Sequence, residues 1–160
     1  MEFGNSLFLA ENADGLILDH ELKREMSEGD AKWLQQRYAG MKENSGDRLC
    51  GVVTDRGFES KASRRMLDEE GLFNGICPRD PKELARRMRA DELFRVTIRR
   101  RAQTEARVAV LKNVFLGGTP RAKGFENRQL QVAWAVLSHN LWVIARLPWA
   151  CEQQAIAEAA

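Results

Sequence analysis

One short stretch, residues 49–58, most constrains the fold of this 160-residue chain. Its apolar part, residues 49–53, is bounded by charged and turn-forming residues, which predicts a buried strand. Asp55 follows at the expected carboxyl end of that strand, where open α/β sheets place their functional groups. Gly57 permits a sharp turn and leaves room beside the carboxylate. Two interpretations stay open on this motif alone: Asp55 belongs to a functional site, or it only closes the strand before a helix.

The residues before this stretch predict a hairpin and a helix. Residues 7–10 and 16–22 are apolar, β-compatible runs, and the segment between them ends in Asp14-Gly15, a hairpin signal. Asp30 is an N-cap candidate for a helix that reaches about residue 43.

The residues after it predict a second helix and a further strand. Ser60 is an N-cap candidate for a helix to about residue 70, and residues 72–77 form the next short apolar run. The order is therefore strand, strand, helix, strand, helix, strand. This is an α/β layer pattern, with a hairpin first and a right-handed crossover later.

The rest of the chain is predicted to be helical. Residues 82–116 form a helical stretch with a break near residue 90, and residues 125–147 form a last helix that is apolar almost all round. The uninterrupted apolar pieces are shorter than the ~18–20 residues that a bilayer requires, so this is predicted to be a core helix. We expect Trp134 and Trp142 to be its large packing groups and His139 to be a hydrogen-bonded core histidine.

Charge is distributed unevenly along the chain. Residues 1–78 carry 10 Lys and Arg against 15 Asp and Glu, whereas residues 79–128 carry 14 against 6. A basic segment of this kind suits a polyanion such as nucleic acid. A solvated helix face is the alternative, and charge alone does not decide between the two.

The cysteines and histidines indicate no metal site. Cys50, Cys77 and Cys151 lack metal-ligand spacing and are predicted to be buried thiols in a reducing compartment. His20 and His139 are too isolated in sequence for a zinc site. No apolar signal segment follows the first residue, so we expect a cytoplasmic protein.

A row of charges falls on an apolar helix face. If residues 94–115 form one helix at ~100° per residue, the following side chains share a face: Phe94, Ile98, Arg101, Glu105, Val108, Lys112 and Phe115. Its apolar members indicate that the face points inward. Three charges would then lie on a dry side, which costs several kcal/mol per ion unless the charge is paired or meets a metal.

Two accounts of this row stay open. Arg101 and Glu105 could form a helix salt bridge worth roughly 0.3–0.5 kcal/mol if exposed, which leaves Lys112 unexplained. Alternatively, Glu105 faces Asp55 across the sheet and both bind a divalent cation, while Arg101 and Lys112 hold a phosphate beside it.

The spacing Arg101-x3-Glu105-x6-Lys112 resembles the Tyr-x2-Arg-x3-Glu-x6-Lys signature of a large group of bacterial insertion-sequence DDE transposases. The turn from Asp55 to Phe58 is similar to the second-aspartate motif of that group. Residues 119–125 and 135–141 resemble its C-terminal end. The resemblance extends over residues 3–148, and the motifs occur in the family's order.

This resemblance implies an RNase H-like catalytic domain that carries out DNA transposition with two Mg²⁺ or Mn²⁺ ions. Asp55 and Glu105 would be the second and third acidic residues of the triad and metal ligands. The residues implied in DNA binding are Arg101, Lys112, Arg56, Arg121 and Lys123. Ile98 stands at the signature tyrosine, so a hydroxyl contact to DNA is lost there.

The first aspartate of the triad is absent. In RNase H-like sheets it lies on a central first strand, which we expect to precede residue 1. Asp14 and Asp19 are poor substitutes because they lie in the turn and second arm of the predicted hairpin. The resemblance therefore implies the C-terminal part of a transposase: residues 1–148 as a partial α/β catalytic domain lacking its central strand, and residues 149–160 as a polar tail.

The implied partners are DNA, as transposon ends and target, and further copies of this chain or intact transposase, in the bacterial cytoplasm at the nucleoid, with no membrane. Three interpretations remain. The chain is a transposase fragment inactive alone, a non-catalytic DNA-binding or regulatory protein, or a remnant reading frame that does not fold.

Overall fold

The computed structural model describes residues 5–24, 29–118 and 122–158, and only the backbone of residues 47, 102 and 149–158. The chain divides into two compact units. Residues 25–103 form one, here called the middle unit. Residues 1–24 and 104–160 together form the other, the terminal unit, so both ends of the chain build the same unit. Each unit is described by itself.

The terminal unit contains the predicted hairpin, which is confirmed. Strands β1 (Ser6–Glu11) and β2 (Ile17–Lys23) pair antiparallel, with Leu9 opposite His20. The Asn12 side chain fixes the turn by accepting hydrogen bonds from the backbone N–H groups of residues 14 and 16, at 3.0 and 2.9 Å.

Gly15 is required in this turn for two reasons. Its φ is +91°, a left-handed conformation that side chains rarely adopt. A Cβ at Gly15 would also lie only 2.8 Å from Nε of Arg107. The Asp-Gly signal therefore reflects both the turn and the close approach of a helix.

Three helical segments complete the terminal unit. Helix α4 (Glu92–Val110) begins in the middle unit and continues into the terminal one, where the π-helix η3 (Leu111–Phe115) extends it. Helix α5 (Phe125–Glu158) follows. The buried core of this unit comprises Ile17, Leu111, Val132, Ala135 and Val136.

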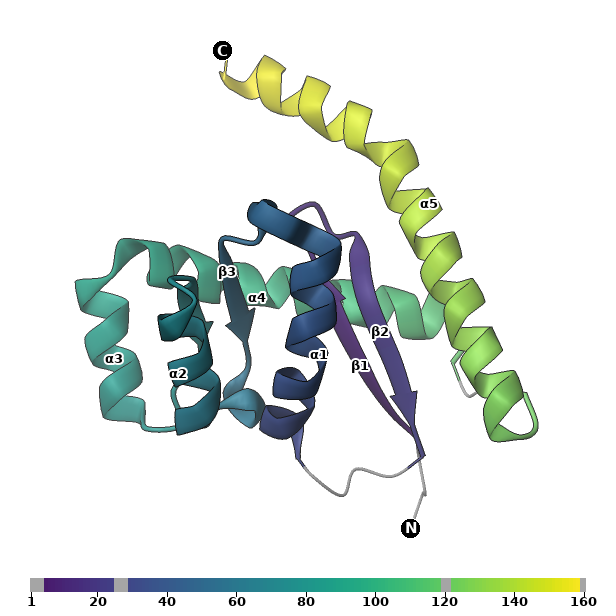
Figure 1. Ribbon diagram of the computed structural model, residues 1–160. Helices are drawn as coiled ribbons and strands as arrows, with labels where there is room; N and C mark the ends of the chain where they lie inside the picture. The colour runs from purple at the N-terminus through teal and green to yellow at the C-terminus, as the bar shows by residue number, and fades with distance from the viewer. Residues whose placement is uncertain (1–4, 25–28, 119–121, 159–160) are drawn as a thin grey trace. The chain divides into compact units, whose positions relative to one another are not determined.

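Helix α5 differs from expectation in length and in burial. It continues through Pro148 to Glu158 instead of ending near residue 147, and its direction changes in its later part (Figure 1). Trp134 is 61% exposed, so its predicted role in core packing is wrong, whereas Trp142, at 41% exposure, packs its ring edge to face against that of Phe115. The face of α5 that meets the core carries three valines, an alanine and His139. None of the helices, within the part of the chain that the structure describes, is long and apolar enough to cross a membrane.

The middle unit follows the predicted order of helices and strands. Strands β3 (Gly51–Thr54) and β4 (Phe73–Ile76) pair in parallel, and helix α2 (Lys61–Glu69) lies between them in sequence. Its other helical segments are α1 (Asp30–Ser45), η1 (Gly46–Arg48), η2 (Arg56–Phe58) and α3 (Pro81–Ala90), together with the first part of α4. The predicted break before α4 is confirmed at Asp91, whose carboxylate accepts a hydrogen bond from the N–H of Phe94 at 2.9 Å.

The two predicted N-caps of this unit have different outcomes. Ser60 caps α2 as predicted, since its hydroxyl accepts a hydrogen bond from the N–H of Ser63 at 2.9 Å. Asp30 is not a cap: Gly29 occupies that position and Asp30 is the first helical residue of α1. The Asp30 carboxylate instead lies beside Gly57, in the turn that follows Asp55.

The protein is a mixed α/β structure with two small sheets and a helical C-terminal half, as predicted, and it is consistent with part of an RNase H-like fold. Among the described residues β3 pairs only with β4, which leaves its other edge without a strand partner. The predicted burial of β3 is accordingly wrong. Val53 is 41% exposed, and Cys50 is exposed while Cys77 is buried.

Candidate active site

Asp55 lies directly after β3, at the carboxyl end of the strand, as predicted. It is exposed and caps η2: its Oδ1 accepts a hydrogen bond from the N–H of Gly57 at 2.8 Å. The turn that follows is therefore fixed by the carboxylate itself. Asp55 thus closes the strand, and its exposure also leaves the carboxylate accessible.

The space beside Gly57 is not empty, contrary to expectation. A Cβ added there would collide with Oδ2 of Asp30 and lie 3.1 Å from Oδ1 of Asp55. Two carboxylates, one from the start of α1 and one from the end of β3, therefore adjoin the same glycine. Sequence patterns did not identify Asp30 as part of this site, because it lies 25 residues away in the chain.

Arg79 holds the Asp55 turn from the adjacent strand end. Its Nε and Nη2 donate to the carbonyl oxygens of Arg56 and Gly57 at 3.1 and 3.2 Å, and its backbone N–H donates to the carboxylate of Glu59. Sequence analysis missed this role. Its position in the sequence could have indicated this role. Arg79 comes just after a strand predicted to run parallel to the Asp55 strand, and the carboxyl ends of parallel strands meet at one edge of a sheet.

Arg64 fixes the same region from α2. Its guanidinium donates to Glu83 of α3 at 2.6 Å and to Glu59 at the end of η2. The hydrogen bond to Glu83 is the largest cause that raises the pKa of Arg64, and it lowers the pKa of Glu83. The ion pairs therefore connect η2, α2 and α3 around the turn.

The charged row on α4 and η3 is less buried than predicted. Phe94 is fully buried, but Glu105 and Lys112 are exposed and Arg101 is half-buried. Because Glu105 and Lys112 are exposed, burial imposes no energetic cost on their charges that a partner or a metal would have to offset. The inward stripe of this stretch is instead formed by Thr104, Val108, Leu111 and Phe115.

A π-helical turn, η3, ends this helical stretch. The N–H of Leu116 donates to the carbonyl of Leu111 at 2.9 Å, five residues earlier, and the carbonyl of Lys112 accepts from Gly118 at 2.9 Å. Such a turn is wider than an α-helical one, and Lys112 is an exposed residue within it. Single π-turns occur frequently at functional sites.

The candidate residues are distributed over both units. Asp55 and Arg56, both exposed, belong to the middle unit, whereas Glu105, Lys112 and the exposed Lys123 belong to the terminal unit. The predicted pairing of Asp55 with Glu105 stays a prediction. Arg121 lies outside the described residues.

The carboxylates at the Asp55 turn are candidate ligands for a divalent cation. Exposed carboxylates are the right chemical type for Mg²⁺. The described residues, however, contain no group of three or more Asp, Glu, His or Cys side chains placed to hold a metal ion. Within the described part of the chain, the carboxylates near Asp55 therefore do not form a complete cation site by themselves.

His139 is buried in the core as predicted, at 1% exposure, but of its ring nitrogens only Nδ1, 3.5 Å from Oδ1 of Asn140, has a hydrogen-bond partner among the described residues. Its ring meets that of Phe115 edge to face, and its Nε2 has no hydrogen-bond partner within the described part of the chain. It lines a cavity of about 30 Å³ together with Glu11, Thr104 and Arg107. A cavity of this size accommodates about one water molecule, so it is not a substrate pocket.

Residues 6–141 match the family model described as a transposase DDE domain. No curated protein and no solved structure gives a match. The matched range covers most of the chain and includes the Asp55 turn and the row from Arg101 to Lys112. The chain therefore belongs to the transposase DDE domain family.

Proposed function

We propose that this chain is part of the catalytic domain of a bacterial insertion-sequence transposase, of the group with the Tyr-x2-Arg-x3-Glu-x6-Lys signature, which cleaves and joins DNA strands. The observation that carries this proposal is the family match over residues 6–141, which contains both an exposed Asp55 at a strand end and the spacing Arg101-x3-Glu105-x6-Lys112.

In this proposal Asp55 and Glu105 are two of the three carboxylates that hold divalent cations in the intact enzyme. When bound, Mg²⁺ or Mn²⁺ supplies the Lewis acidity for phosphoryl transfer. Arg101, Lys112 and Arg56 bind the phosphates of the DNA end, and Arg121 and Lys123 extend that contact. Arg79 keeps the Asp55 turn in place through its bonds to the backbone.

We further propose that residues 1–148 are the catalytic part and residues 149–160 an appendage, and that the 160-residue chain is inactive alone because its third carboxylate has to come from elsewhere. The edge of β3 that has no strand partner among the described residues supports this, since an additional strand there would bring a side chain next to Asp55.

The test is a nicking assay on supercoiled plasmid with Mg²⁺ or Mn²⁺. The 160-residue chain should give no nicks above the buffer level. A protein extended by its upstream in-frame codons should nick the plasmid, and Asp55→Asn or Glu105→Gln should abolish this. Glu126→Gln, at an exposed glutamate of α5, is the matched control and should leave nicking unchanged. Nicking by the short chain that Glu105→Gln abolishes would refute its inactivity. An extended protein that nicks equally well without either carboxylate would refute the transposase proposal.

A second candidate function is that of a non-catalytic DNA-binding protein, which regulates transposition by binding transposon ends or intact transposase. It is favoured by the exposed basic side chains of residues 79–128, which include Lys82, Arg86, Arg89, Arg99 and Lys112. DNA binding that weakens steeply with salt, without cleavage by either protein form, would support this function. Binding that is absent or insensitive to salt would refute it.

A further inference from the structure

Helix α5 has two apolar faces, and only one of them meets the rest of its unit. The buried face carries Val132, Ala135, Val136, His139 and Val143. It packs beside η3 and β2, to which Asn140 is joined by two hydrogen bonds to the backbone of Ile17. This face accounts for the attachment of α5 to the terminal unit.

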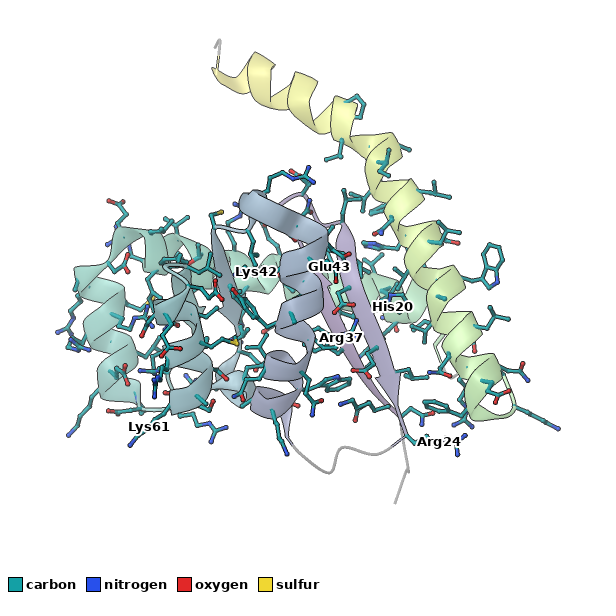
Figure 2. The ribbon with its side chains drawn as sticks, in the orientation of Figure 1. His20, Arg24, Arg37, Lys42, Glu43 and Lys61 are labelled. Atoms are coloured by element: carbon teal, nitrogen blue, oxygen red, sulfur yellow. The ribbon has the colours of Figure 1, made fainter. Side chains whose placement is uncertain are left out.

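The second face, here called the outer seam, is exposed. It consists of Leu130 (58% exposed), Trp134 (61%), Leu137 (47%), Leu141 (59%) and Ile144 (52%). At ~100° per residue these side chains fall within about 40° of one line on the helix, opposite the buried face. Figure 2 shows side chains projecting from both sides of α5.

The spacing of the outer seam is that of a helix-pairing surface. Successive members are four, three, four and three residues apart, the repeat that keeps a seam facing a partner helix. From Leu130 to Ile144 the seam extends ~21 Å, about four turns. A solvated helix face would carry charged residues at these positions.

Charge identifies the kind of partner. Residues 129–145 contain no Asp, Glu, Lys or Arg, and the one histidine among them, His139, is buried on the opposite face. DNA is therefore not the partner, since no cation is present to bind phosphate. A second copy fits, because a two-fold axis places like residues near like and an uncharged seam creates no repulsion.

We propose that the outer seam pairs with the outer seam of a second copy of this chain, antiparallel, with Leu137 at the two-fold axis. In this alignment Trp134 of one copy lies opposite Leu141 of the other, and Leu130 opposite Ile144. The large Trp134 then meets the smaller Leu141, whereas a parallel pair would place tryptophan against tryptophan. The exposed parts of the five side chains amount to roughly 500 Å² on one copy and about 1,000 Å² on two, the size at which specific interfaces begin.

This inference rests on the proposed transposase function and specifies a second copy of the chain as the partner. The pairing itself requires neither metal nor DNA. Its failure is therefore distinguishable from a failure of the catalytic proposal, because mass in solution and plasmid nicking are measured separately.

The first test is sedimentation equilibrium of the 160-residue chain without DNA. We expect a monomer–dimer equilibrium that Leu137→Glu shifts toward monomer by at least tenfold in Kd, since a charge would face its own copy at the axis. Leu93→Glu is the matched control, because Leu93 is a helical leucine of similar exposure (55%) outside α5. It should leave Kd unchanged. A wild-type chain that is monomeric at all concentrations, or equal effects of both variants, would overturn the proposal.

The second test determines orientation by disulfide formation. In a background with Cys50, Cys77 and Cys151 replaced by serine, Leu130→Cys and Ile144→Cys proteins are mixed and oxidised. The antiparallel pair predicts a mixed disulfide between the two proteins. Disulfides formed only between two copies of the same variant would overturn the antiparallel pairing. Circular dichroism of each variant, compared with that of the wild type, verifies that the chain is folded.

Discussion

At the residue scale, the side chain of Asn140 links helix α5 to strand β2 through two hydrogen bonds. Its Nδ2 donates to the carbonyl of Ile17, and its Oδ1 accepts from the N–H of the same residue, both at 2.9 Å. One side chain thereby satisfies both backbone groups at the beginning of β2. Because Ile17 is in the core, these groups have little access to water.

We predict that Asn140→Ala lowers the free energy of unfolding by about 1–3 kcal/mol, because it leaves a buried donor and acceptor unpaired. Urea unfolding followed by circular dichroism measures this. Gln129→Ala, at an exposed position of the same helix, is the control and should stay within ~0.5 kcal/mol of the wild type. Equal stabilities of the two variants would contradict the role of Asn140.

Arg79 is a positioning residue for the Asp55 turn, since its guanidinium donates to two successive backbone carbonyls. A lysine keeps the charge but cannot reproduce the planar fork. We predict that Arg79→Lys increases amide hydrogen exchange at Gly57 and Glu59 by about tenfold, as expected for losing ~1.4 kcal/mol of local stabilisation.

Nuclear magnetic resonance exchange rates of these two amides measure the effect. Arg65→Lys is the control, because Arg65 forms an exposed ion pair within α2. Unchanged exchange at Gly57 in Arg79→Lys would mean that the Asp55 turn is stable without this side chain.

At the element scale, the ion pair between Arg64 and Glu83 joins α2 to α3. The hydrogen bond from Arg64 lowers the pKa of Glu83 from its ordinary value of 4.5. Because the folded-state pKa is the lower one, the pair stabilises the fold above pH 4.5. This contribution is lost as the pH falls through the folded-state pKa.

We predict that Glu83→Gln costs about 1 kcal/mol at pH 7 and that the difference from the wild type disappears in acid. Urea unfolding at pH 7 and at successively lower pH tests this. Glu69→Gln, which removes an exposed pair, is the control. A difference that persists below the folded-state pKa would show that packing, not charge, accounts for the loss.

At the scale of the whole molecule, the structure divides the basic residues into two groups. Some serve the fold: Arg87 donates to carbonyls of β4 and lies over the Phe94 ring at 3.9 Å, and Arg107 pairs with Glu11. Others are exposed, and Lys82, Arg86 and Arg89 share one face of α3. Only the exposed group can contribute to DNA affinity.

We predict that replacing Lys82, Arg86 and Arg89 by glutamine weakens the salt dependence of binding to duplex DNA. The slope of the logarithm of the association constant against log[salt] should fall by up to ~2.7, about 0.9 for each phosphate contact that is lost. Fluorescence anisotropy at several salt concentrations measures this. Lys61→Gln, at the exposed beginning of α2 (Figure 2), is the control. If the triple variant kept the wild-type salt dependence, as the Lys61→Gln control should, the α3 face would not contact DNA.

The sequence by itself determined the features that depend on neighbouring residues. Asp14-Gly15 predicted the hairpin, Ser60 the start of α2, and Asp55 the end of β3, because turns and caps are decided within a few residues. The match to the transposase DDE domain family over residues 6–141 likewise comes from the order of residue types along the chain.

Only the tertiary structure decided what depends on packing. The nearly continuous apolar run of residues 125–147 assigned Trp134 to the core, but a helix with two apolar faces buries only the face that a neighbour covers. Helical periodicity placed Glu105 on a dry side, although Thr104, Val108 and Leu111 take the inward positions. Arg79 became part of the site only because its parallel strand ends beside the Asp55 turn, since contacts between distant residues depend on how the elements assemble.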